Sequence, residues 1–198
     1  MTKDTVVLDI DGVLADYRLG LLYWIRQSVP ELAQAANAHI MRTDTWINAD
    51  TMGVSYRKWL ETLEMFRMSG GKQSIPLFEG AAEFVSWIDR RNWQLVLVTS
   101  RPIDIYSNIY RDTVEWLRHN CLGDRLLLWS KSKAEILFRL RMIDRIRFAV
   151  DDEHGHVMDY AALEVKTYWL NHYNVVMGIL NHVTEVKNLV EIVKHEQS

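Results

Sequence analysis

The sequence contains a single cysteine, Cys121, among its 198 residues. An intrachain disulfide and a zinc site built on cysteines are therefore excluded, and so low a cysteine content is typical of a reducing compartment. No apolar run approaches the ~18 residues that a membrane-spanning helix needs. The first apolar stretch, residues 6–8, ends at an aspartate and is too short for a signal peptide. We therefore expect a cytoplasmic protein with no membrane association.

An excess of one charge is also missing, since 23 basic residues stand against 26 acidic ones and the net charge is −3. A chain without a basic surplus has no electrostatic reason to bind long nucleic acid tightly. With 48% hydrophobic residues, only 9 glycines and only 3 prolines, the composition excludes a disordered chain and a collagen. At ~150 residues per domain, the length predicts one domain, or one domain with an insert.

Most of the chain alternates between strand and helix patterns. Short apolar runs predict strands at residues 5–10, 95–98, 126–129, 148–150 and 165–170. Amphipathic patterns predict helices at residues 80–91, 104–120, 132–142 and 184–195. Such alternation favours crossover connections and a parallel sheet. Residues 17–75 show helical patterns alone, so we expect a core domain of residues 1–16 and 76–198 with a helical insert between them.

Three aspartates, Asp9, Asp11 and Asp16, lie within eight residues directly after the first predicted strand. In a parallel sheet, ligands bind beyond the carboxyl ends of the strands. Carboxylates two residues apart repel each other, which favours a bound cation or the protonation of one of them. An ordinary Asp-Gly turn is the alternative. A calcium loop does not fit, because Gly20 stands where its twelfth position requires glutamate.

Polar residues also follow the second and fourth predicted strands. Thr99-Ser100-Arg101 offers hydroxyl and backbone donors that suit phosphate oxygens, although a helix cap is an alternative reading. Asp151-Asp152 offers two carboxylates, although adjacent acids are also common in loops. The nearby His154 and His156 read as ordinary loop residues, because no cysteine or paired histidine helix accompanies them.

Two lysines, Lys131 and Lys133, lie near the start of the helix predicted after the third strand. Ser132 and Glu135 have the spacing of a capping box, which places Lys133 in the first helical turn. A cation in a first helical turn opposes the helix dipole, so local stability does not explain it. The spacing does not decide which lysine belongs to a site. Carboxylates, a lysine and hydroxyls at four successive strand ends together suit magnesium-assisted phosphoryl transfer.

These segments resemble the four motifs of the haloacid dehalogenase (HAD) superfamily. The matching residues are Asp9-Ile10-Asp11-Gly12-Val13-Leu14-Ala15-Asp16, Val98-Thr99-Ser100-Arg101-Pro102, Lys133 and Asp151-Asp152. The resemblance implies an α/β fold, a Rossmann-like parallel sheet with a small helical cap inserted after the first strand. Within the superfamily, the chain is most similar to the 5′(3′)-deoxyribonucleotidases, through its first motif, the helical insert and Thr99-Ser100.

The resemblance also implies roles for single residues. Asp9 would be the nucleophile and form an aspartyl-phosphate. Asp11 would protonate the leaving group, then activate water, and would bind Mg²⁺ through its backbone carbonyl. Thr99 would hold a phosphate oxygen, with Ser100 and Arg101 beside it as substrate-binding residues.

The remaining motif residues would complete a magnesium site. Lys133 would neutralise charge on Asp9 and the phosphate, with Lys131 as the rival for that role. Asp152 would bind the metal together with Asp9 and Asp11, and Asp151 would hold Lys133 or a bound water. The roles of the two adjacent aspartates could be reversed, so both belong to the predicted metal site.

The helical insert would act as a cap that selects the substrate. Three of its tryptophans, Trp24, Trp46 and Trp59, are the first candidates for stacking on a base. The predicted function is thus a magnesium-dependent phosphatase for a small phosphorylated substrate, with a nucleotide favoured. A 3′-phosphatase acting on nucleic-acid ends and a non-catalytic binding module of the same fold are the alternatives, and a homodimer is left open.

Overall fold

The computed structural model describes residues 4–42, 46–176, 178 and 181–197. Its contacts divide the chain into two compact units. The sheet unit comprises residues 1–15, 77–101 and 124–198, and the helical unit comprises residues 16–76 and 102–123. Among the residues described, no helix is both long enough and apolar enough to cross a membrane.

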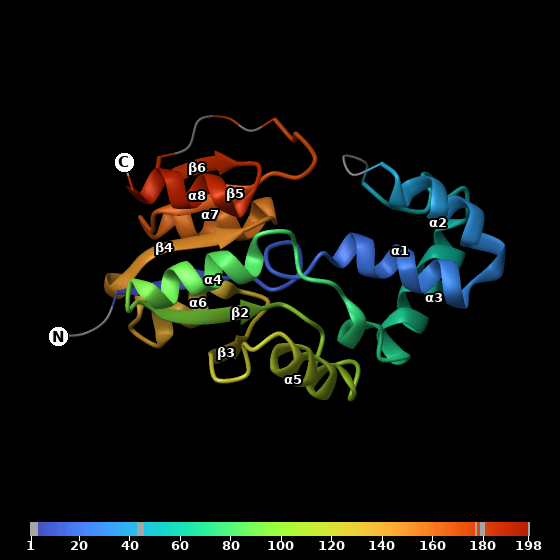
Figure 1. Cartoon of the computed structure of the whole chain (residues 1–198), viewed down its shortest axis with the longest axis horizontal. Helices are drawn as coiled ribbons and strands as arrows, with labels where there is room; N and C mark the ends of the chain where they lie inside the picture. The colour runs from blue at the N-terminus through green and yellow to red at the C-terminus, as the bar shows by residue number, and fades with distance from the viewer. Residues whose placement is uncertain (1–3, 43–45, 177, 179–180, 198) are drawn as a thin grey trace. The chain divides into compact units, whose positions relative to one another are not determined.

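A six-stranded parallel sheet forms the middle of the sheet unit (Figure 1). Its spatial order is β3-β2-β1-β4-β5-β6. The strands are β1 (Thr5–Leu8), β2 (Gln94–Thr99), β3 (Leu126–Trp129), β4 (Ile146–Asp151), β5 (Thr167–Leu170) and β6 (Val183–Val186). The chain moves outward from β1 in one direction through β2 and β3, then returns and moves the other way from β4. Such a reversal of strand order marks the crevice where ligands bind in open α/β sheets.

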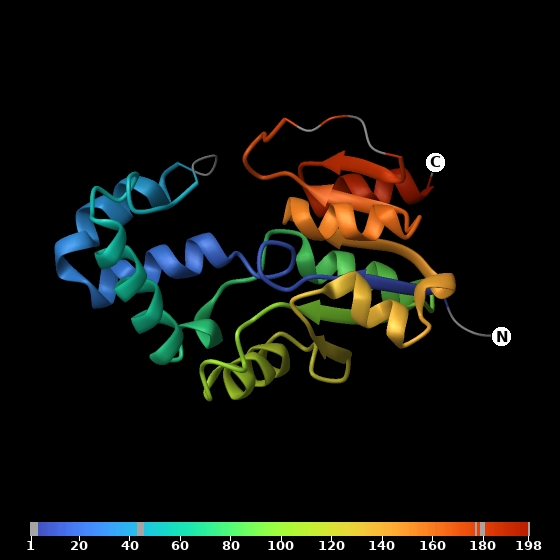
Figure 2. The same ribbon diagram turned by 180° about the vertical axis from the view of Figure 1, so that it is seen from behind.

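Helices cover both faces of this sheet. They are α4 (Ala81–Arg90), α6 (Lys133–Arg139), α7 (His154–Ala162) and α8 (Leu189–Gln197). Figure 1 shows α4 and α8 on the near face, and Figure 2 shows α6 and α7 from the other side. A short 3₁₀ turn, η3 (Ile143–Arg145), leads into β4. Between the sheet and the pair α6–α7 lies an apolar cluster that includes Val7, Val96, Leu137 and Tyr160, all nearly or fully buried. Because β1 is covered on both faces, all four of its residues are buried and three of them are apolar, without alternation.

The helical unit consists of helices and 3₁₀ turns. They are α1 (Tyr17–Ser28), η1 (Pro30–Leu32), α2 (Ala33–Ile40), α3 (Tyr56–Met68), η2 (Gly71–Ser74) and α5 (Ile109–His119). Asp16 caps α1, because its Oδ1 accepts a hydrogen bond of 2.9 Å from the amide of Leu19. The ring of Phe66 is fully buried, and the rings of Tyr17 and Trp24 pack edge-on against it.

Helix α5 groups with the helical unit, whereas the sequence analysis places it in the core domain. The side-chain Nε1 of Trp116 donates a 2.7 Å hydrogen bond to the carbonyl of Ile75, and Gln73 Nε2 donates one of the same length to Asp112. Both contacts join α5 to the segment around η2 and are too distant in sequence for a local pattern to reveal.

The structure confirms the predicted parallel α/β sheet and corrects several elements. The predicted helix at 184–195 is wrong in its first part, because residues 183–186 form the sixth strand. Helix α7 was missed, so His154 and His156 are helical residues rather than loop residues. The helix predicted at 104–120 begins only at Ile109. Ser132 does precede α6, but within the described chain its side chain makes no capping hydrogen bond.

Candidate active site

Asp9 directly follows β1 and is still held in the sheet. Its amide donates a 3.1 Å hydrogen bond to the carbonyl of Val150 on β4. Since the four residues of β1 are buried, the strand brings this carboxylate into the interior, where it is 6% exposed. A carboxylate so placed needs compensating partners, because burial disfavours its charged form.

One partner is Lys133, the first residue of α6, whose side chain is only 1% exposed. Its Nζ lies 2.9 Å from Asp9 Oδ2 and 2.8 Å from Asp151 Oδ2, so one ammonium joins two strand ends. Asp151 Oδ1 accepts a further hydrogen bond of 3.0 Å from the amide of Glu153. Burial alone would lower the pKa of Lys133, but the charges of Asp9 and Asp151 and their hydrogen bonds raise it above its usual value. Lys133 is therefore a cation at neutral pH.

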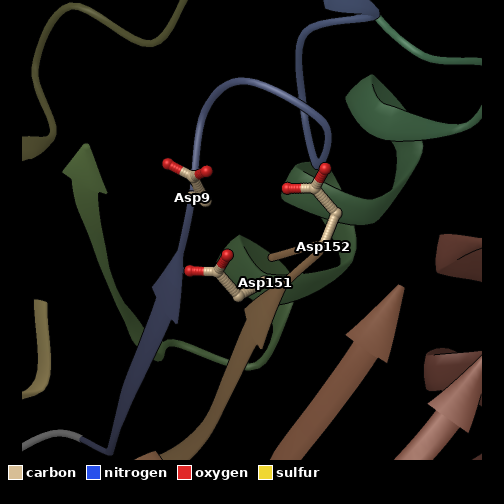
Figure 3. Close-up of side chains that lie close together, drawn as sticks. All are labelled: Asp9, Asp151 and Asp152. Carbon is tan, nitrogen blue, oxygen red and sulfur yellow. The ribbon is translucent and has the colours of Figure 1, made fainter. Parts of the chain in front are cut away.

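Asp152 brings a third carboxylate to the same place. Asp9, Asp151 and Asp152 each offer an oxygen, and these oxygens lie within 4.8 Å of one another. Figure 3 shows Asp9 beyond the tip of β1 and Asp151 at the tip of the neighbouring β4, with Asp152 one residue further on. We call these three residues the acidic cluster. The structure thus brings together residues that are more than 140 positions apart in the sequence.

Burial and mutual repulsion disfavour the ionised forms of the acidic cluster. Burial raises the pKa of Asp9, and the attraction of Lys133 does not fully offset this effect. Burial and the charge of Asp9 raise the pKa of Asp151 to about 7. Burial and the charges of Asp151 and Asp9 also raise the pKa of Asp152. Three carboxylates share one lysine, so an additional cation would stabilise their ionised forms.

A divalent metal ion fits the residues present. Asp9 Oδ1 is buried, and it has no hydrogen-bond partner among the described residues. Leaving such an oxygen unsatisfied is costly, which is consistent with a site built for a ligand that supplies the missing interaction. Hard cations such as Mg²⁺ prefer carboxylate oxygens of this kind. Asp9, Asp151 and Asp152 are therefore the residues that could hold a metal.

The position of Asp152 depends on the glycine that follows Asp11. Gly12 has φ +86°, and a Cβ added to it would lie 2.1 Å from Asp152 Oδ2. The carboxylate therefore packs against the bare backbone of the turn, which no larger residue would permit. The carbonyl of Asp152 also accepts a 3.1 Å hydrogen bond from Trp169 Nε1.

His172 is a further residue of the site that the sequence analysis missed. Its Nε2 lies 2.6 Å from the carbonyl of Gly12, and its ring stacks on Phe78 with the centroids 4.8 Å apart. The imidazole therefore holds the turn after Asp9 in place. His172 lies two residues beyond the end of β5, so the strand-end argument applied to Thr99 and Asp151 also applies to it.

Asp11 lies outside the acidic cluster and pairs with Arg101 instead. Arg101 Nε donates to Asp11 Oδ2 at 2.9 Å, and a terminal nitrogen donates to Oδ1 at 2.6 Å. We call this two-point ion pair the Asp11–Arg101 fork. Next to it Thr99 is buried and its hydroxyl accepts a 3.3 Å hydrogen bond from the amide of Arg101, while Ser100 is half-buried.

The other residues predicted to bind substrate lie in different surroundings. Lys131 is exposed, whereas Lys133 is buried in the acidic cluster. The three tryptophans belong to the helical unit. Trp59 is 7% exposed and lies in the core of that unit, whereas Trp46 is 58% exposed. Trp24 is half-buried and lines a cavity of about 330 Å³ within the helical unit, together with Tyr23 and Arg26.

Comparisons with known proteins agree with this architecture. No protein-family model and no curated protein sequence matches the chain. Solved structures do match it along nearly its whole length. YfnB from Bacillus subtilis, assigned to the HAD hydrolases and solved bound to magnesium, is similar with a TM-score of 0.64 at 15% identity, covering 100% of both chains. A HAD phosphatase from Thermococcus onnurineus has a TM-score of 0.60 at 16% identity, covering 98% of this chain and 97% of that one.

A third similar structure is a haloacid dehalogenase-like hydrolase from Streptococcus pneumoniae. Its TM-score is 0.60 at 11% identity, and the match covers 98% of this chain and 99% of that one. Likeness at such low identity establishes the fold. The chain therefore has a HAD-type fold, as its motifs predict, while the narrower resemblance to the deoxyribonucleotidases stays a prediction.

Proposed function

We propose that the protein is a magnesium-dependent phosphatase that hydrolyses a small phosphate monoester through an aspartyl-phosphate on Asp9. The observation that carries the proposal is the setting of Asp9. Its carboxylate is buried at a strand end, touches Lys133 on one oxygen and leaves the other oxygen without a partner among the described residues. Such an oxygen is suited to attack phosphorus or to bind a cation, and Lys133 is placed to offset the charge of an incoming phosphate.

In the first step, an Asp9 oxygen would form a bond to phosphorus while the bond from phosphorus to the ester oxygen breaks. The leaving oxygen would take a proton from Asp11, so an alcohol departs and Asp11 becomes a carboxylate. In the second step, water would attack the same phosphorus and give a proton to Asp11. The Asp9–phosphorus bond breaks, which restores the Asp9 carboxylate and releases inorganic phosphate.

The surrounding residues would bind and orient the phosphoryl group. The hydroxyl of Thr99 and the backbone beside it are suited to phosphate oxygens, and Lys133 supplies a fixed positive charge. Asp9, Asp151 and Asp152 would hold Mg²⁺. When bound, this ion supplies positive charge that reduces the repulsion between the carboxylates and the phosphate. Lys133 would keep Asp9 and Asp151 at a fixed separation during the reaction.

A nucleotide is the substrate that we favour, because the sequence motifs resemble those of the 5′(3′)-deoxyribonucleotidases. The first motif and Thr99-Ser100 support this narrower assignment, as does the helical insert with its aromatic residues. The presence of Asp11 supports phosphate chemistry over dehalogenation, because a dehalogenase needs no proton donor for an ester oxygen.

The test is a phosphatase screen of the purified protein with MgCl₂, using nucleoside monophosphates, sugar phosphates and a 3′-phosphorylated oligonucleotide. We expect turnover of nucleoside monophosphates, and reversible loss of that turnover in excess chelator. Asp9→Asn should abolish turnover while the circular dichroism spectrum stays unchanged, because an amide cannot serve as this nucleophile. Asp124→Asn is the matched control, since its side chain is 78% exposed, and this variant should keep full activity.

Three outcomes would each contradict a different element of the proposal: the covalent intermediate, the metal ion or the substrate. Near wild-type activity of Asp9→Asn would rule out the aspartyl-phosphate. Full activity in excess chelator would remove the metal ion. Preference for the 3′-phosphorylated oligonucleotide or for sugar phosphates would overturn the nucleotidase assignment and leave the broader phosphatase intact.

A further inference from the structure

The Asp11–Arg101 fork joins two strand ends beside Asp9. Arg101 comes two residues after the end of β2, and Asp11 comes two residues after Asp9. The arginine side chain is 1% exposed, whereas that of Asp11 is 23% exposed. A buried guanidinium is stable only while an anion faces it, because burial of an uncompensated charge is very unfavourable.

The fork also occupies the group that the proposed mechanism needs for proton transfer. Both oxygens of Asp11 accept hydrogen bonds from the guanidinium at 2.6 and 2.9 Å. A carboxylate held in this way has both oxygens engaged as acceptors and does not present a proton to a leaving group. The arrangement in the structure therefore holds Asp11 in place but does not by itself allow the first step.

We propose that Arg101 is a positioning residue that exchanges partners when substrate binds. It pairs with the Asp11 carboxylate while the site holds no phosphate, and it turns to two phosphate oxygens when the ester enters. Asp11 is thereby released, takes up a proton from water and can then give it to the leaving oxygen. This inference rests on the proposed phosphatase function. A phosphate presents the same two-oxygen edge as a carboxylate, and the planar guanidinium matches both. Arg101 keeps an anionic partner in both states.

In this exchange, phosphate and the Asp11 carboxylate compete for the guanidinium of Arg101. Two ligands that compete for one group weaken each other, and removal of one strengthens the binding of the other. Asp11→Asn should therefore tighten the binding of inorganic phosphate by about tenfold or more, since a hydrogen bond to a charged partner no longer has to be broken. In the Arg101→Gln background, the same Asp11→Asn change should tighten binding by less than about threefold, which is the part due to charge repulsion alone.

Titration calorimetry with inorganic phosphate and MgCl₂ measures phosphate affinity for four full-length proteins: the unmodified chain, Asp11→Asn, Arg101→Gln and the double variant. The four affinities give the effect of Asp11→Asn with and without Arg101. Melting temperatures show that each variant is folded. Arg125→Gln is the matched control, because Arg125 also pairs with an aspartate, Asp89, at 2.7 Å in the same unit. Phosphate binding should be unchanged in this control.

Arg101→Lys provides a second test if Arg101→Gln does not fold, because lysine keeps the charge but cannot form the fork. In the Arg101→Lys background, Asp11→Asn should again tighten phosphate binding by less than about threefold, because no fork has to be broken. A tightening of about tenfold or more in this background would overturn the positioning role of Arg101.

The calorimetric results separate this inference from the function on which it rests. If phosphate binds and Asp11→Asn tightens it equally with and without Arg101, the partner exchange is overturned while the phosphatase proposal stands. If no variant binds phosphate and the unmodified protein hydrolyses no ester, the proposed function fails and the exchange fails with it.

Discussion

At the scale of single residues, the acidic cluster leaves buried polar groups incompletely satisfied. Asp9 Oδ1 is buried without a partner among the described residues, and Lys133 pairs with two of the three clustered carboxylates, those of Asp9 and Asp151. A buried polar atom left unsatisfied destabilises a fold by about 1–3 kcal/mol, and more when it is charged. Violations of this kind are expected at functional sites, where a ligand supplies what the protein lacks.

Gly12 gives a prediction about the metal. Gly12→Ala should weaken Mg²⁺ binding by about tenfold, because a methyl group would displace the Asp152 carboxylate, and loss of a contact that orients a metal ligand typically costs about 10–100-fold in metal affinity. Positive φ at this position adds strain for any residue other than glycine. The measurement is the Mg²⁺ concentration that gives half of the maximal rise in melting temperature.

Gly155→Ala is the matched control for this prediction. Gly155 lies in α7, and a Cβ added there would meet no described atom within 4 Å. We expect the same Mg²⁺ response as in the unmodified protein, with a slightly higher melting temperature, because alanine favours a helix. An unchanged Mg²⁺ response in Gly12→Ala would mean that Asp152 does not bind the metal.

The sequence analysis found the residues that carry charge at strand ends, but not the contacts that orient them. Asp9 and Asp151 follow from strand ends, which are visible in a local pattern, whereas the spacing alone did not separate Lys133 from Lys131. The contact of His172 with Gly12 and the Asp11–Arg101 fork join positions 160 and 90 residues apart, and no periodicity reveals them. Arg101, which the sequence resemblance implies is a substrate-binding residue, is paired with Asp11 in the structure.

At the scale of secondary structure elements, α8 is held to the sheet by a buried carboxylate. The side chain of Glu196 is 1% exposed and accepts hydrogen bonds from Arg147 at 2.8 Å, Lys166 at 2.6 Å and Tyr168 at 2.9 Å. Burial alone would raise the pKa of Glu196, but these hydrogen bonds and the charges of Lys166 and Arg147 lower it below its usual value. The ionised form is therefore favoured in the folded protein.

A lowered pKa in the folded state adds stability above the unfolded pKa, and this stability is lost as the pH falls through the folded value. Glu196→Gln should thus lower the free energy of unfolding by about 1–2 kcal/mol at pH 7, and the difference should shrink below about pH 4. Urea unfolding at pH 7 and below about pH 4 measures this difference in the free energy of unfolding, with Glu83→Gln as an exposed control on α4. An effect of equal size at both pH values would assign the loss to packing rather than to charge.

The elements that the sequence analysis missed show where local patterns fail. Helix α7 contains a glycine and two histidines, and of its buried residues His156, Val157 and Tyr160 only Val157 is aliphatic, so the hydrophobic pattern is weak. Packing against the sheet, rather than propensity, stabilises such a helix. The topology did require it, because parallel neighbours such as β4 and β5 need a crossover, usually a helix. Strand β6 ends two residues before Asn188, which caps α8: its Oδ1 accepts a hydrogen bond from the amide of Glu191. A strand and a helix therefore adjoin where one continuous helix was predicted.

At the scale of the whole molecule, the two units carry different chemistry. The acidic cluster, Lys133 and the Asp11–Arg101 fork all belong to the sheet unit. These groups suit a metal and a phosphate, but none of them can distinguish one base from another. Selection among phosphate esters must then come from other residues, and the aromatic side chains of the helical unit are the candidates.

Replacement of these aromatic residues separates a nucleotidase from a general phosphatase. Trp24→Ala and Trp46→Ala should lower kcat/KM for nucleoside monophosphates by about 5- to 100-fold, from the ~1–3 kcal/mol of lost base stacking. Hydrolysis of nitrophenyl phosphate, which has no base, should change far less. Trp59 is instead a core residue, so its replacement should lower the melting temperature and affect both substrates alike.

Phe138→Ala is the control for this comparison, because Phe138 is an exposed aromatic residue of the sheet unit, at 62%, and lies on α6. Its loss should change neither substrate, since an exposed ring removed from a helix surface leaves no cavity. Equal losses on nucleotides and nitrophenyl phosphate in Trp24→Ala and Trp46→Ala would mean that these side chains only stabilise the helical unit. Base recognition would then have to be sought among the residues beside the acidic cluster, because charge and metal binding alone distinguish a phosphate from other groups but not one nucleotide from another.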